Sequence, residues 1–146
     1  MVTACGGKKE ESKRKAGLLY KSARIRHLYR KTRELGVPFF ILSAKYGLIS
    51  GDEEVEPYEA VMTSEKCGEL LPSILERLRD FDVIVYYRGG ARSDYYDCIR
   101  KGAELLKKEL VSFGYGNMGD IGRLEEIVKS LRDGDFGAKR GTERSR

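Results

Sequence analysis

The chain has 146 residues, of which 40% are hydrophobic, enough for one domain with a single core. We expect that domain over residues 1–132 and a flexible basic tail over 133–146. The longest apolar run, over 37–42, is too short to span a bilayer, and no basic segment followed by an apolar stretch marks a secretory signal. These features predict a cytoplasmic protein without a membrane partner.

The formal net charge is +5, and basic residues gather over 8–15, over 24–33 and in the tail. A basic surface favours a phosphate-bearing ligand or a nucleic acid as the partner. The alternative is a solvated, charge-rich surface with no specific ligand. For 8–33 both interpretations stay open, whereas the tail favours the solvated surface.

The cysteines are Cys5, Cys67 and Cys98, an odd number without a C-x-x-C pair. This usage predicts free thiols in a reducing compartment, rather than a disulfide scaffold or a zinc site. Cys67 and Cys98 lie on apolar helix faces and are expected in the core. His27, the single histidine, has no ligand-spaced partner, so we expect no metal and no cofactor.

The first half of the chain alternates between strand and helix signals. A short strand is expected over 1–4, followed by a Gly-Gly turn and a polar stretch. Apolar residues at helical spacing predict a helix over 25–35, capped by Ser22 and ended by Gly36. A continuously apolar strand over 39–42 follows, and 46–62 lacks a sustained period and is predicted to be a long loop.

The second half continues the alternation. A helix over 67–78 is expected either to kink at Pro72 or to begin anew there. The strongest strand signal covers 81–87, and Ser93 is expected to cap a helix whose apolar face extends to Leu110. A fourth strand over 110–113 and a last helix over 121–131, capped by Asp120, complete the prediction.

This order predicts a three-layer αβα sandwich with a small, mostly parallel central sheet of three to four strands. Ligands of such folds bind beyond the carboxyl ends of the strands. There the chain has CGGK over 5–8, SAKYG over 43–47 and RGG over 88–90, each with a glycine and a cation. We therefore expect the ligand site where these turns meet.

Each turn also has a plainer interpretation. Gly6 and Gly7 suit either close backbone approach to a ligand or a tight strand-to-helix turn. Cys5, near lysines, is either a nucleophile or a small buried hydrophobe. The 43–47 turn offers a hydroxyl, a cation and an aromatic ring, and 88–90 followed by Ser93 suits an anion at a helix N-terminus.

Four segments together resemble a widespread family of unknown function with the pattern C-x-x-K-K, LY-x-S, SAKYGLI and PY. They are found here over 5–9, 19–22, 43–49 and 57–58. The pattern is also similar to the YaaA-like peroxide-stress proteins and, distantly, to the lysine-bearing module of archaeosine synthase, although no histidine follows Ser22. The resemblance implies a link to nucleobase or nucleic-acid metabolism.

Two hypotheses follow. In the first, the protein acts on or binds a nucleobase or nucleotide, with Lys8 or Lys45 as the electrostatic or nucleophilic group and Glu56 as a further catalytic candidate. An enzyme of this kind would be a transferase, a lyase or a glycosidase-like protein. The expected ligand-binding residues are Cys5, Gly6, Gly7, Lys9, Tyr20, Ser22, Ser43, Tyr46, Gly47, Tyr58, Gly89, Gly90 and Ser93. In the second, the basic face from Lys8 to Arg33 binds nucleic acid without catalysis.

Overall fold

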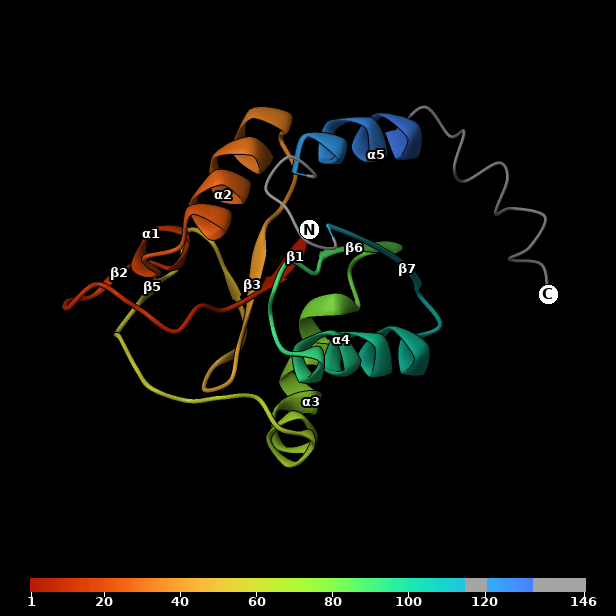
Figure 1. Cartoon of the computed structure of the whole chain (residues 1–146). Helices are drawn as coiled ribbons and strands as arrows, with labels where there is room; N and C mark the ends of the chain where they lie inside the picture. The colour runs from red at the N-terminus through yellow and green to blue at the C-terminus, as the bar shows by residue number, and fades with distance from the viewer. Residues whose placement is uncertain (115–120, 133–146) are drawn as a thin grey trace.

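The computed structural model describes residues 1–114 and 121–132, in which strands and helices alternate (Figure 1). The strands are β1 (Val2–Ala4), β2 (Arg14–Lys15), β3 (Phe40–Ser43), β4 (Gly47–Ser50), β5 (Glu54–Val55), β6 (Val83–Tyr87) and β7 (Glu109–Phe113). The helices are α1 (Ala16–Leu19), α2 (Ala23–Leu35), α3 (Ser64–Leu78), α4 (Ser93–Leu106) and α5 (Arg123–Arg132). The predicted tail and the predicted cap Asp120 lie outside the described residues.

The main sheet of the described residues has the strand order β4-β3-β1-β6-β7. β1 pairs in parallel with β3 on one side and with β6 on the other, β6 pairs in parallel with β7, and β4 is antiparallel to β3. The predicted α/β class is confirmed. The sheet has one strand more than the three to four expected.

The additional strand, β4, lies in the segment 46–62, and the prediction of a long loop there is wrong in its first part. Gly47, at φ 77°, turns the chain back, so that Leu48 and Ile49 are buried opposite Leu42 and Ile41. β5 follows and pairs with β2 in a separate small sheet. Two short strands separated by a turn at Gly51 leave too few residues for a period-2 pattern to be visible.

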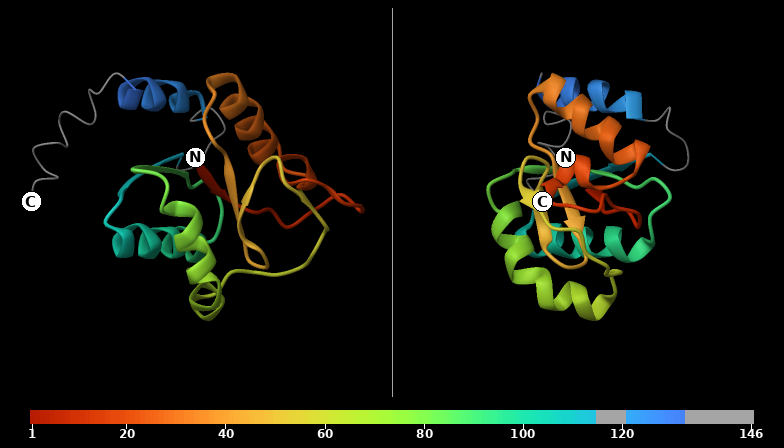
Figure 2. Two further views of the ribbon diagram at one scale, coloured as in Figure 1. Left: turned by 180° about the vertical axis from the view of Figure 1, so that it is seen from behind. Right: turned by 90° about the vertical axis from the view of Figure 1, so that its left-hand side faces the viewer.

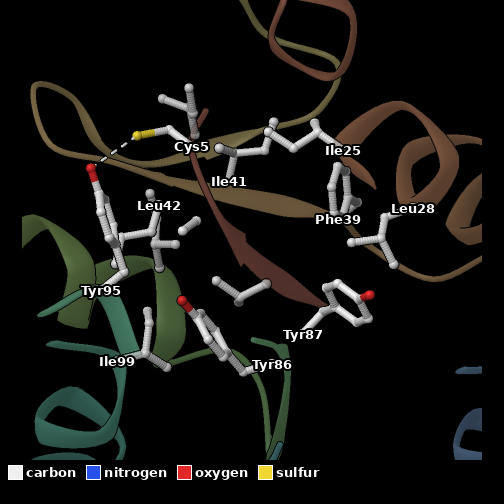
Figure 3. Packing of buried hydrophobic residues seen from close by; sticks show 14 of the residues in the cluster. Cys5, Ile25, Leu28, Phe39, Ile41, Leu42, Tyr86, Tyr87, Tyr95 and Ile99 are labelled. Carbon is white, nitrogen blue, oxygen red and sulfur yellow. Dashed lines mark hydrogen bonds between the residues drawn. The ribbon is translucent and has the colours of Figure 1, made fainter. Parts of the chain in front are cut away.

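Helices cover both faces of the main sheet, as Figure 2 shows from two further sides. α2 and α5 lie on one face, where Arg132 of α5 donates to the carbonyl of Leu35 at the end of α2. α3 and α4 lie on the other, with Gly102 of α4 against Leu78 of α3. Because β3 is buried between these layers, Ile41 points toward α2 and Leu42 toward α4 (Figure 3).

The helix boundaries follow local chemistry. Ser22 caps α2, its Oγ accepting from the Ile25 N–H at 3.2 Å, and Gly36 ends the helix at φ 68°, both as predicted. α3 runs through Pro72 without a second start. The predicted cap of α4 is wrong: Ser93 is the first helical residue, and Arg92 precedes it without a side-chain cap. Leu110 belongs to β7 and not to the face of α4.

The prediction of free thiols is wrong for Cys67 and Cys98, which form a disulfide between α3 and α4. Both residues are buried, as expected, but the helices bring their sulfurs together, a contact that spacing in the sequence does not reveal. Cys5 is free and buried. Within the described ranges, no helix combines the length and the apolar character that a membrane crossing requires.

The disulfide closes a loop with a sequence separation of 31 residues, and its reduction is expected to lower the free energy of unfolding by roughly 3–4 kcal/mol. Urea denaturation with and without dithiothreitol measures this change. The double variant Cys67→Ala, Cys98→Ala serves as the control, because dithiothreitol should not affect it. If dithiothreitol did not change the urea midpoint of the native chain, this result would contradict the cross-link.

Candidate functional site

The turns after β1, β3 and β6 lie at one edge of the sheet, because these strands are parallel. β1 is the middle strand, so the turn at 5–7 lies between the other two. The helices that follow β1 and β6 cover opposite faces, α2 on one side and α4 on the other. This edge between β1 and β6 is therefore the point where the strand order reverses, the usual ligand position in open α/β sheets.

The segment 56–62 borders this edge and is held at both ends. The hydroxyls of Tyr58 and Tyr20 are 2.5 Å apart, and the Met62 N–H donates to the Tyr95 hydroxyl at 3.2 Å. Burial raises the pKa of Tyr20 and of Tyr58, so both phenols stay protonated at neutral pH. Residues of this segment line three clefts of the described structure.

The first cleft, called here the β1–β6 cleft, has a volume of about 410 Å³. Its walls come from the turns after β1 and β6, from the segment 56–62 and from the two helices that follow. The lining residues are Cys5, Gly6, Gly7, Arg24, Ala60, Val61, Gly90, Ala91, Arg92 and Tyr95. Of the residues predicted from the sequence, Cys5, Gly6, Gly7 and Gly90 are thus brought together.

The Cys5 thiol points toward Tyr95 (Figure 3) and donates to its hydroxyl at 3.4 Å. The same hydroxyl accepts from the Met62 N–H, so this contact joins the end of β1, the start of α3 and the first turn of α4. Cys5 is only 8% exposed, yet it lines the cleft. Burial and the hydrogen bond with Cys5 raise the pKa of Tyr95, which stays protonated.

Arg24 is the half-buried cation of the β1–β6 cleft, whereas the sequence pattern predicted it on a basic helix face. Its guanidinium donates to the Thr3 hydroxyl at 2.5 Å and to the Ala4 carbonyl at 3.1 Å. Desolvation lowers its pKa, and no carboxylate among the described residues forms an ion pair with it. Gly89, at φ 53°, lies against this side chain, where a Cβ would come within 2.9 Å of the Arg24 Cδ.

The second cleft, called here the lysine cleft, has a volume of about 490 Å³ and is lined by Gly7, Lys8, Lys9, Glu10, Lys21, Pro57, Tyr58 and Glu59. Lys9 is fixed in it. Its Nζ donates to the Gly7 carbonyl at 3.0 Å and lies 4.5 Å from the ring centroid of Tyr58 and 5.7 Å from that of Tyr20. The ammonium therefore covers the rings of Tyr20 and Tyr58, both of which were expected to bind the ligand.

The third cleft, of about 370 Å³, is lined by Ala44, Lys45, Tyr58, Glu59, Ala60, Lys66, Glu69 and Leu70. Tyr58 and Glu59 separate it from the lysine cleft, so Lys8 and Lys45 lie at the same edge but in different clefts. The Lys45 Nζ lies 5.2 Å from the ring centroid of Tyr46.

The other predicted residues hold the scaffold. The buried Ser43 hydroxyl accepts from the N–H groups of Lys45 and Tyr46, both at 3.0 Å, and so shapes the turn. Gly47 is buried, Tyr20 has no exposed surface, and Ser22 is occupied by its capping bond. The exposed Glu56 lines none of the three clefts, and its carbonyl accepts from Tyr46 at 3.4 Å.

Residues 1–71 match a family of unknown function (DUF6884). The DUF6884 segment contains the turns after β1 and β3 and the segment 56–62, whereas β6 and α4 lie beyond it. No curated protein and no solved structure matches the chain. The resemblance to YaaA-like proteins and to archaeosine synthase therefore has no support from these comparisons.

Over the described ranges, no group of three or more His, Cys, Asp or Glu side chains is placed to hold a metal ion.

Tyr58→Phe should lower the free energy of unfolding by about 1–3 kcal/mol, because it leaves the fully buried Tyr20 hydroxyl without its partner. Tyr46→Phe is the matched control and should change stability by less than about 0.5 kcal/mol, since its hydroxyl makes one long, exposed bond. Urea denaturation of both variants measures the difference. Equal losses would contradict the anchoring role of the Tyr20–Tyr58 pair.

Proposed function

We propose that the chain binds a nucleotide in the β1–β6 cleft, with its phosphate on Arg24. The observation that supports this most directly is the half-buried guanidinium of Arg24, which lines the cleft and forms no ion pair with a described carboxylate. Removing a charge from water is costly unless an opposite charge and hydrogen bonds compensate for it, and Arg24 has hydrogen bonds to Thr3 and Ala4 but no opposite charge. A phosphate entering the cleft supplies both, through charge-assisted hydrogen bonds.

The backbone around Arg24 suits an anion as well. α4 begins at this cleft without a side-chain cap, so its first N–H groups and its dipole favour negative charge. Arg92 adds an exposed cation, which Asp94 partly neutralises at 2.9 Å. Gly6 and Gly7 allow a phosphate to come close to the chain on the opposite wall.

The remaining wall suits a nucleobase. Ala60 and Val61 line the cleft, and the Val61 side chain is 52% exposed although it is apolar. Contact with a flat base would remove this apolar surface from water. The ring of Tyr95 and the thiol of Cys5 lie in the same cleft. The ligand class is thus a phosphate with an adjoining flat, partly apolar group.

The alternative, an open nucleic-acid-binding face from Lys8 to Arg33, is less well supported because carboxylates neutralise most cations of α2. Arg26 pairs with Glu10 at 2.7 Å, and Arg33 pairs with Asp52 at 2.9 Å. Lys31 lies between Glu34 and Glu125 at 3.7 and 3.9 Å. A helix face whose charges are paired in this way attracts a polyanion weakly.

Isothermal titration calorimetry with AMP, GMP, CMP, UMP and adenosine tests the proposal. At least one monophosphate should bind more tightly than adenosine, and Arg92→Ala should weaken it about tenfold through the loss of one charged contact. Arg79→Ala, an exposed arginine at the end of α3, is the matched control and should bind as the native chain does.

Two results would contradict the proposal. One is the absence of binding for all five compounds at millimolar concentration. The other is an equal loss of monophosphate affinity in Arg92→Ala and Arg79→Ala, combined with binding of a 20-nucleotide single strand whose affinity falls steeply with salt. An open nucleic-acid-binding face would give this combination.

A further inference from the structure

We infer that the nucleotide is a nucleoside polyphosphate, whose outer phosphates cross Gly7 and lie in the lysine cleft. This inference rests on the proposed nucleotide site in the β1–β6 cleft. It extends that site to a second cleft, which the proposal does not use.

The two clefts meet at Gly7, which lines both of them. Gly7 is exposed, and a Cβ placed on it would meet no atom within 4 Å. Gly7 itself therefore places no side chain between the two clefts, and the side chain bonded to its carbonyl is the cation Lys9. When one phosphate binds near Gly6 and Arg24, the phosphates attached to it can extend over Gly7 toward Lys8 and Lys9.

The cations of the lysine cleft differ from Arg26, Lys31 and Arg33 of α2, each of which has a carboxylate partner. No carboxylate of the described residues lies within 4.0 Å of the ammonium groups of Lys8, Lys9 or Lys21. The cleft also contains Glu10 and Glu59. Glu10 forms an ion pair with Arg26, and the hydrogen bond from Arg26, together with the positive charge of Lys21, lowers the pKa of Glu10. The positive charge of the lysines therefore exceeds the negative charge left in the cleft.

Lys9 stands in a fixed position at the boundary. Its bond to the Gly7 carbonyl and its contact with Tyr58 hold the ammonium beside the crossing point, and two of its N–H donors remain for a ligand. A cation that is already ordered loses little entropy when a phosphate binds. Because Lys9 covers the face of Tyr58, the lysine cleft suits phosphates and not a stacked base.

The test compares AMP, ADP, ATP and inorganic tripolyphosphate by isothermal titration calorimetry, in EDTA and at constant ionic strength. ATP should bind at least about tenfold more tightly than AMP, since its outer phosphates add charged contacts with lysines. The double variant Lys8→Ala, Lys21→Ala should reduce ATP affinity to within about threefold of AMP affinity and leave AMP binding unchanged.

The matched control is Lys13→Ala, Lys15→Ala, which removes the same charge from exposed lysines outside the cleft. It should leave the preference for ATP intact. Equal loss of ATP affinity in both double variants would overturn the inference, because it would indicate diffuse attraction. Equal affinity for AMP and ATP, or for tripolyphosphate and ATP, would also overturn the inference. If AMP still bound in a way that depends on Arg92, the proposed nucleotide site in the β1–β6 cleft would be unaffected by that result. If no nucleotide binds, the proposed site itself fails.

Discussion

The parallel pairing of β1 with β3 on one side and β6 on the other determines the rest of this structure. β1 has three residues, all buried, and its one polar side chain connects the sheet to the cleft. The Thr3 hydroxyl donates to the Tyr87 carbonyl at 3.0 Å and accepts from Arg24. One buried hydroxyl thus joins β1, β6 and the first turn of α2, and it orients the guanidinium only while the strands keep this pairing. The position of Arg24 is a consequence of the register of the sheet.

The segment 56–62 is a second determinant, because it divides the edge of the sheet into separate clefts. Its anchors, Tyr58 and Met62, are buried, whereas Val61 between them is exposed. Their partners, Tyr20 and Tyr95, lie far apart in the sequence, one before α2 and one in α4. A loop fixed at two buried points has little freedom to move, so the clefts on either side of it are largely preformed in the free protein. A preformed cleft suits a small ligand, whereas an extended, adaptable surface suits a larger partner.

The fold could be predicted because its signals are local. The apolar face of α2, its Ser22 cap and Gly36 lie within one short stretch of sequence, and the buried strands β3 and β6 are continuously apolar. The hairpin at Gly47 was missed because two short strands show no period. The Cys67–Cys98 disulfide depends on the contact of α3 with α4, which residue spacing does not express. This disulfide also removes the argument from free thiols for a cytoplasmic location.

The candidate site could be predicted as an edge of the sheet and in its glycine turns, but not in the side chains of Arg24 and Tyr95. Because β1 and β6 are parallel neighbours, the turns that follow them lie together, and this proximity does not depend on which side chains the turns have. Whether a side chain enters a cleft depends on contacts distant in sequence: Ser43 turns inward to bind its own loop, and Arg24 turns inward because Gly89 leaves room for it. The same dependence applies to charge. A net charge of +5 says little about binding, since Arg26 and Arg33 of α2 are paired with the carboxylates of Glu10 and Asp52. Only the folded chain distinguishes a cation with a counter-ion from one without. Arg24 and Lys8, which form no ion pair with a described carboxylate, line two clefts that meet at Gly7.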